Sequence, residues 1–181
     1  KECDWSSDVC SSDLTPDGST DQTAPVRGLL DTGDTVGHPH HSRSHRVSAD
    51  RTLLMIKPDA VAKNAIGDIL QRLEAEGFVI RQMRMNHLSQ EQAQGFYEVH
   101  KERPFFGELV SFMTSGPSVQ VALQRENAVA HLRGFIGETD STKAAAGTIR
   151  ALFGTDIQCN AVHASDSDDN AAQEIAFYFG D

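Results

Sequence analysis

The apolar pattern of this 181-residue chain begins abruptly near Asp50. Residues 1–49 are rich in Ser, Asp, Thr, Gly, Pro and His and show hardly any apolar periodicity. Such a segment buries too little surface to offset the conformational entropy that folding costs, so we predict that it is disordered. At 181 residues the chain is long enough for one well-packed domain and short for two, and we place that domain at residues 50–181.

The start of the chain has an unusual sequence. Residues 1–14, KECDWSSDVCSSDL, begin with Lys and resemble a peptide translated from sequencing-adapter DNA. Residues 15–49 fit either translated upstream sequence or a flexible tail, and their four histidines, at positions 38, 40, 41 and 45, favour a solvated polar tract over a metal site. We therefore expect residues 1–49 to be a disordered or artefactual leader.

Apolar spacing predicts the first strand and the first helix of the domain. RTLLMI, residues 51–56, has the pattern of a buried strand, which ends before Pro58 because proline has no N–H for a strand ladder. Apolar residues then recur at i, i+3, i+4 and i+7 over residues 66–73, and Gly77 is a helix stop.

A second strand and two helices are expected next. Residues 78–88, FVIRQMRMNHL, have strand-forming side chains with partial alternation. Ser89 and Gln92 form a capping box that begins a helix, and a further apolar stripe over residues 106–113 predicts another.

The last part of the chain predicts two strands and two helices. SVQVALQ, residues 118–124, alternates cleanly and predicts a strand packed on one side, and Asn127 is a candidate cap for the helix after it. Ser165 or Ser167 can begin the last helix, and EIAFYF, residues 174–179, predicts a short final strand. The order β-α-β-α-α-β-α-α-β fits an α+β sandwich, a four-stranded antiparallel sheet covered by helices.

Charge and cysteine content limit the classes of function. The chain has 16 basic and 26 acidic residues, a net charge of −10, so we do not expect nucleic acid as a partner. The three cysteines, Cys3, Cys10 and Cys159, lack the even number and regular spacing of a disulfide scaffold, which favours a reducing compartment. No apolar run is long enough to cross a membrane and no secretory signal pattern is visible, so we predict a cytoplasmic protein without membrane contact.

His163 is the residue whose surroundings suggest chemistry. It precedes a predicted helix, whose N-terminus favours phosphate, and a neutral imidazole with a pKa of about 6.5 is a nucleophile at cytoplasmic pH. A zinc site lacks further ligands at suitable spacing, and Ser165, His163 and Asp166 are too close along the chain for a hydrolase triad. A P-loop kinase is excluded because its motif is absent. A structural core histidine, the commoner role of a lone histidine, remains open beside the nucleophile.

Four motifs follow one another along residues 50–181: RTLLMIKPDAV, YEVHKERPFFGELVSFMTSGP, GTIR and NAVHASDS. Their order and spacing closely resemble the nucleoside diphosphate kinase family. The resemblance implies a ferredoxin-like sandwich and a ping-pong reaction. In that reaction the γ-phosphoryl group of a nucleoside triphosphate, chiefly ATP, passes through a phosphohistidine to nucleoside diphosphates and so maintains the NTP and dNTP pools.

The resemblance also implies roles for individual residues. His163 matches the phosphorylated histidine, Glu174 the acid that orients its ring, and Ser165 the hydroxyl that supports this acid, although a helix cap remains an alternative for Ser165. Lys57 matches a lysine that contacts the phosphates and the ribose, and Tyr97 a tyrosine beside the γ-phosphate. The other matches are nucleotide-binding: Arg133, Thr139 and Arg150 for the diphosphate, Asn160 for the ribose, and Phe105, Leu109 and Ile157 for the base.

Cofactor and assembly follow from the same resemblance. Mg²⁺ is expected to be held mainly through the nucleotide phosphates, with no all-protein metal site. Ser141 replaces a proline that often occurs in this loop of the family, and the chain stops at Asp181 without a longer C-terminal segment, so we expect a homo-oligomer, preferably a tetramer, with a dimer or hexamer as alternatives. The competing hypothesis is a non-catalytic nucleotide-binding or regulatory module with the same fold.

Overall fold

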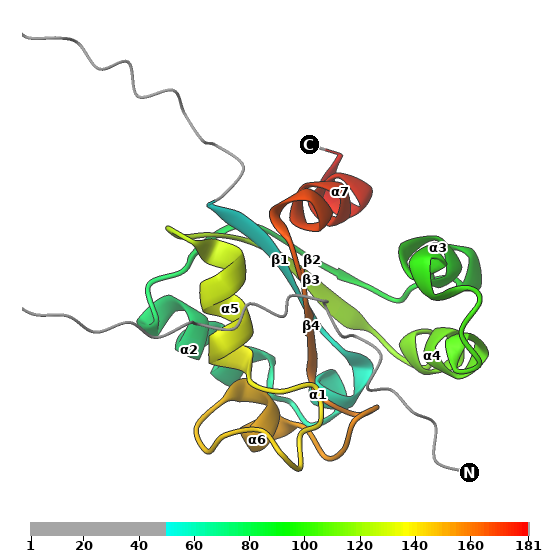
Figure 1. The fold of residues 1–181 in the computed structure, drawn as a ribbon, viewed down its shortest axis with the longest axis horizontal. Coiled ribbons are helices and arrows are strands. Elements are labelled where there is room, and N and C mark those ends of the chain that lie inside the picture. Colours follow the sequence, from blue (N-terminus) through cyan, green and yellow to red (C-terminus); the bar gives the residue numbers. More distant parts are fainter. Residues whose placement is uncertain (1–49, 181) are drawn as a thin grey trace, which may run out of the picture. The chain divides into compact units, whose positions relative to one another are not determined.

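The computed structural model describes residues 50–180, and the predictions made for residues 1–49 lie outside them. Four strands of the described part form one antiparallel sheet in the order β2-β3-β1-β4. Their bounds are β1 (Arg51–Ile56), β2 (Val79–Asn86), β3 (Ser118–Gln124) and β4 (Val162–Ala164). The predicted α+β sandwich with a four-stranded antiparallel sheet is confirmed (Figure 1).

Helices cover both faces of the sheet (Figure 1). The helices on one face are α1 (Pro58–Ala62), α2 (Ile66–Ala75), α5 (Ala128–Ile136) and α6 (Ile149–Phe153). The other face carries α3 (Gln90–Phe96), α4 (Phe106–Met113) and α7 (Asp168–Phe179), with a 3₁₀ turn at Glu98–His100 between α3 and α4. No helix within residues 50–180 is long and apolar enough to cross a bilayer.

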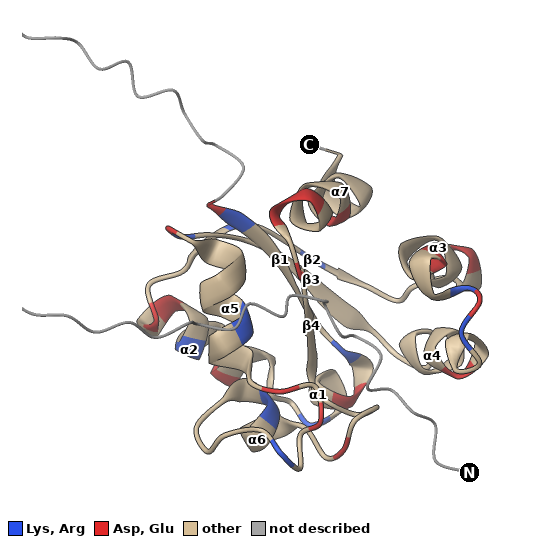
Figure 2. Ribbon diagram, in the orientation of Figure 1, with Lys and Arg blue, Asp and Glu red and all other residues tan. Residues whose placement is uncertain are grey.

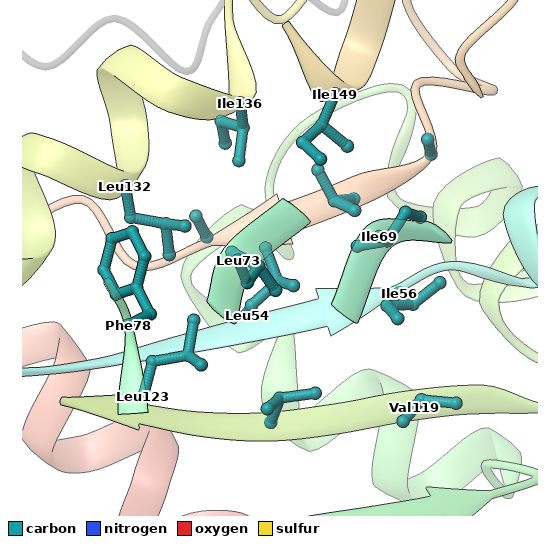
Figure 3. Packing of buried hydrophobic residues seen from close by; sticks show 14 of the residues in the cluster. Leu54, Ile56, Ile69, Leu73, Phe78, Val119, Leu123, Leu132, Ile136 and Ile149 are labelled. Carbon is teal, nitrogen blue, oxygen red and sulfur yellow. The ribbon is translucent and has the colours of Figure 1, made fainter. Parts of the chain in front are cut away.

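Two apolar clusters hold these layers together. In the first, Leu54 and Ile56 of β1 point towards α2 and α5, where Leu73 and Leu132 meet them (Figure 3). All four side chains have no exposed surface, and burial of each stabilises the fold by about 1.5–3 kcal/mol. The second cluster joins the opposite face of β1 to α3, α4 and α7. Strand β1 is thus buried on both faces. This burial fixes the backbone of β1, with which the neighbouring strand β4 pairs.

Strand β3 was expected to pack on one side only, and this prediction was wrong. Ser118, Gln120 and Ala122, which alternate with the apolar positions, are as buried as Val119 and Val121. The reason is position: β3 lies between β2 and β1 with helices over both faces, so its polar side chains are enclosed too. The Nε2 group of Gln120 donates a hydrogen bond to Ser118 Oγ at 2.8 Å.

The C-terminal prediction also needs correction. Residues 174–179 were expected to form a strand, but they continue helix α7, while the fourth strand is the three-residue β4. Ala171, Ile175 and Tyr178 recur at helical spacing and are all buried. A helix places these three side chains on one face, whereas a strand would distribute them over both faces. Helices α1 and α6 were not predicted, since each has only five residues.

Helix ends follow the local chemistry in most cases. Ser89 and Gln92 form the predicted capping box of α3, with hydrogen bonds of 3.2 Å and 3.0 Å. Gly77 follows α2 with φ +89°, as a helix stop requires. Asn127 does precede α5, but it adopts a left-handed conformation and its side chain makes no capping hydrogen bond.

Candidate active site

His163 lies at the centre of β4, opposite Met55 of β1. Helix α7 returns across the sheet and brings Glu174 to the imidazole, where Glu174 Oε1 accepts a hydrogen bond from His163 Nε2 at 2.9 Å. The two side chains keep 24% and 19% of their surface exposed, so the pair is enclosed but reachable from solvent. Because Nε2 is held by the carboxylate, Nδ1 is the ring nitrogen left for chemistry.

Ser165 joins this pair to the sheet. Its hydroxyl donates to Glu174 Oε2 at 2.6 Å and accepts from the Leu53 N–H at 3.2 Å, and the side chain is fully buried. Its own N–H donates to the Leu53 carbonyl at 3.1 Å. The helix cap that was considered for Ser165 is instead Ser167, whose Oγ accepts from the Asn170 N–H at 3.2 Å.

Two aromatic rings confine the imidazole. Phe96 at the end of α3 lies edge-to-face with His163, with ring centroids 5.3 Å apart and an interplanar angle of 80°. Tyr97 makes a similar contact at 6.1 Å and 85°. Helix α7 closes the same region with Tyr178, whose ring lies 5.0 Å from that of Phe96. The pKa of Tyr178 is raised by burial and then by the negative charge of Glu174, so this phenol stays protonated at neutral pH.

Two cations frame the opposite side of the site. Lys57, directly after β1, is largely buried and donates from Nζ to Asn160 Oδ1 at 2.7 Å. Asn160 is fixed in turn because its Nδ2 donates to the carbonyls of Thr139 and Ile157 at 3.0 Å and 3.1 Å. Arg150 of α6 donates to the Val162 carbonyl at 3.0 Å, one residue before His163. In Figure 2, basic segments (blue) occur on α5 and α6, the helices that carry Arg133 and Arg150.

One pocket collects the residues that were predicted from the sequence. All of them except the buried Ser165 line it: Lys57, Tyr97, Phe105, Leu109, Arg133, Thr139, Arg150, Ile157, Asn160, His163 and Glu174. Phe105 and Leu109 are at most 6% exposed and, with Ile157, form an apolar part of the wall. The pocket therefore combines an apolar slot, three cations and an acid-paired histidine.

Sequence reasoning did not assign several lining residues. These are Phe96, Val99, His100, Ala164, Asp166 and Asn170. Phe96 ends helix α3 and His100 ends the 3₁₀ turn after it, and the sequence alone suggests that both residues pack in the core. Asn170 Nδ2 donates a hydrogen bond to Asp166 Oδ1 at 2.6 Å. Asp166 directly follows Ser165 in the sequence, and this position could have indicated that Asp166 and Asn170 lie at the pocket.

Cys159 directly precedes the pocket residue Asn160 in the sequence. It is a free thiol beside Asn160. Burial, followed by the negative charges of Asp156 and Asp59, raises the pKa of the Cys159 thiol. Since the thiolate is the reactive form, the raised pKa makes Cys159 a poor nucleophile at neutral pH.

An acid-paired histidine in a cationic pocket with an apolar slot has the groups that phosphoryl transfer needs. The family model for nucleoside diphosphate kinase matches residues 50–181, and this family match identifies the class as a phosphotransferase. The chain belongs to the nucleoside diphosphate kinase family and has the activity of that family.

Individual relatives agree with this assignment. A nucleoside diphosphate kinase from Dechloromonas aromatica is 56% identical over 133 residues, which cover 74% of this chain and 94% of that protein. One from a Nitratiruptor species is 57% identical over 130 residues, which cover 72% of this chain and 95% of that protein.

Solved structures of the family share the fold. The Aquifex aeolicus nucleoside diphosphate kinase has a TM-score of 0.71 and 51% identity, covering 72% of this chain and 94% of that one. The halophilic enzyme from Halobacterium salinarum, in complex with CDP, has a TM-score of 0.70 and 39% identity, covering 74% and 89%. The ferredoxin-like sandwich that was expected is the fold of this protein.

Proposed function

We propose that this nucleoside diphosphate kinase works by a ping-pong mechanism through phospho-His163. The observation that carries the proposal is the 2.9 Å hydrogen bond from His163 Nε2 to Glu174, which holds the proton on Nε2 and leaves the lone pair of Nδ1 as the nucleophile. Glu174 is oriented in turn by Ser165, and the negative carboxylate stabilises the positive charge that the ring gains as Nδ1 bonds to phosphorus.

The two half-reactions are balanced. In the first, a bond forms between Nδ1 and the γ-phosphorus of a nucleoside triphosphate, chiefly ATP, while the bond to the β,γ-bridging oxygen breaks and a diphosphate leaves. In the second, a terminal β-phosphate oxygen of another nucleoside diphosphate attacks the phosphohistidine and restores the free ring. Charge on the transferred group is spread over three oxygens, so fixed cations supply much of the catalysis. Lys57, Arg133 and Arg150 line the pocket where these oxygens would lie.

The rest of the pocket fits a nucleotide. We assign Arg133, Thr139 and Arg150 to the diphosphate and Tyr97 to the region of the γ-phosphate. Lys57 is assigned to the phosphates and the ribose, and Asn160 to the ribose. The apolar slot of Phe105, Leu109 and Ile157 takes the base by stacking and packing, which distinguishes little between purines and pyrimidines. The Halobacterium salinarum relative, in complex with CDP, supports nucleotide binding here.

Mg²⁺ is the cofactor that we propose. The pocket offers oxygen donors of the hard type that Mg²⁺ prefers, among them the carboxylate of Asp166 and the hydroxyl of Thr139. No group of three or more His, Cys, Asp or Glu side chains within residues 50–180 is arranged to hold a metal. The residues fit an ion held mainly by the nucleotide phosphates, where it would neutralise phosphate charge.

We also propose a homo-oligomer, preferably a tetramer. Strand β2 is at the edge of the sheet, and Val79, Met83 and Met85 on it are 49%, 54% and 54% exposed. An exposed apolar edge strand is a liability in a monomer and supports association with another chain. Light scattering that gives the mass of a single chain would contradict this proposal. The proposed compartment is the cytoplasm, in keeping with the free thiol of Cys159.

The decisive experiment is to trap the intermediate. Incubation of the protein with γ-labelled ATP and Mg²⁺ should give an acid-labile, alkali-stable label on His163 that GDP discharges and that forms slowly when EDTA removes the metal. His163→Ala should lose both the label and nucleotide exchange. Full exchange activity in His163→Ala, or a label found on another residue by mass spectrometry, would contradict the mechanism. Binding of nucleotide without any label would favour the non-catalytic module.

A further inference from the structure

A strained turn lies between two of the pocket residues. Ala161 has φ +68°, a left-handed conformation that alanine rarely adopts. The Val162 N–H donates to the Asn160 carbonyl at 2.8 Å, so these three residues close a γ-turn. The γ-turn with a positive φ at its central residue is the rare and strained form. Something else in the molecule must therefore hold Ala161 in this shape.

The turn decides how two ends of the pocket face each other. On one side of Ala161, the Asn160 side chain accepts the hydrogen bond from Lys57 Nζ at 2.7 Å. On the other side, Val162 begins β4, whose next residue is His163. A change of φ at Ala161 would rotate the peptides on both sides, and Asn160 and His163 would no longer keep their relative positions.

Asp59 is the side chain that holds the turn. It lies in the first turn of α1, and its Oδ2 accepts a hydrogen bond from the Ala161 N–H at 3.0 Å across 102 residues of sequence. The Ala161 carbonyl accepts from the Lys57 N–H at 2.9 Å. Both backbone polar groups of Ala161 are thus bound by the segment 57–59. A carboxylate acceptor makes the contact to Asp59 stronger than one between neutral groups.

We propose that Asp59 is a positioning residue for phosphoryl transfer: by binding the Ala161 N–H it keeps the γ-turn in its strained form and so sets Asn160 and His163 around the nucleotide. The proposal rests on the proposed function of the pocket. Without a side-chain acceptor at position 59, Ala161 relaxes towards a negative φ, and the nucleophile moves relative to the bound phosphates. Displacement of a reacting group by about 1 Å lowers rates by roughly 100-fold.

The test pairs the loss of the brace with relief of the strain. Asp59→Ala should lower kcat for nucleotide exchange by roughly 10- to 100-fold. The double variant Asp59→Ala/Ala161→Gly should recover most of the loss, because glycine adopts a positive φ without steric cost and needs no brace. Asp59→Asn retains a side-chain oxygen acceptor and should stay close to the wild type. The control is Asp68→Ala, which removes an exposed acid from the first turn of α2.

Two outcomes would overturn the proposal. One is a folded Asp59→Ala protein with the kcat of the wild type. If urea unfolding then shows a lower stability, Asp59 has a structural role only. The other is a loss of kcat that Ala161→Gly does not recover. The Asp59 variants are compared by their rate of nucleotide exchange. The phosphohistidine mechanism is tested separately, by labelling of the wild-type protein, so the failure of one proposal can be told from the failure of the other.

Discussion

Replacing Glu174 by glutamine tests how the carboxylate acts on the nucleophile. Glu174 accepts two hydrogen bonds, from His163 Nε2 at 2.9 Å and from the Ser165 hydroxyl at 2.6 Å. Glutamine keeps the shape of the side chain but has one oxygen and no charge. Its amide can present the oxygen to the imidazole and the NH₂ group to Ser165, so the ring stays oriented. What is lost is the negative charge beside the ring.

The size of the effect follows from the kind of hydrogen bond. A bond to an ionised group stabilises by about 1.5–3 kcal/mol and a bond between neutral groups by about 0.5–1.5 kcal/mol, a difference of roughly 1–1.5 kcal/mol. The pair retains 24% and 19% exposure, so solvent screening keeps the loss in this range. Since about 1.36 kcal/mol corresponds to tenfold in rate, Glu174→Gln should slow phosphorylation of the histidine about tenfold. Glu174→Ala also frees the ring to turn and should slow it about 100-fold or more.

Quench-flow measurement of the label from γ-labelled ATP in a single turnover gives this rate directly. Glu91→Gln, the same change at an exposed position in the first turn of α3, is the matched control. A wild-type rate in Glu174→Gln would refute the role of the charge. Equal rates in the Gln and Ala variants would refute the idea that the side chain holds the ring in place.

Two further predictions concern stability and domain organisation. The hydrogen bond from His131, with the attraction of His131 and Arg125, holds the pKa of Glu76 below its usual value. A lowered pKa stabilises the fold above the unfolded pKa of about 4.3, and this stabilisation is lost as pH falls through the lower folded value. Glu76→Gln should therefore have a lower free energy of unfolding than the wild type above about pH 5, and the difference should shrink at about pH 3. Urea unfolding at the two pH values measures it. A difference that does not change with pH would contradict the lowered pKa of Glu76. A chain that begins at Asp50 should keep the full exchange activity and the urea midpoint of unfolding, because residues of 50–180 form both apolar clusters and the pocket. A lower activity or a lower midpoint would show that residues 1–49 contribute.

Elements with strong local patterns were predictable from the sequence. A pattern within a few residues predicts each of three elements: the apolar run for β1, the helical spacing for α2 and the capping box for α3. Strand β4 does not, because it has three residues with a histidine at the centre and exists through its pairing with β1. Local pattern also gave no sign that β3 is enclosed on both faces, since that depends on which helices cover it.

The pocket was predictable as a set of residues, but not as a geometry. Motif spacing and the family resemblance brought His163, Lys57 and Arg150 to attention. The hydrogen bond that the Ala161 N–H donates to Asp59 joins positions 102 residues apart. The residue type of Ala161 gives no sign of its positive φ. Long-range backbone contacts of this kind follow from the fold alone.

The helix predicted to begin near Ser167 was expected to give way to a strand at Glu174, but in the structure it continues to Phe179. Glu174 must reach His163, eleven residues earlier. An extended chain of that length would span about 36 Å, so the turn and the helix between the two residues are what bring them together. A helix that begins at Asp168 rises only about 9 Å by Glu174, so one turn at Ser167 brings the carboxylate back over the sheet. The position of Glu174 therefore follows from the helix before it, and the buried side chains of Ala171, Ile175 and Tyr178, at helical spacing, favour continuation of that helix over the strand that local propensity suggests.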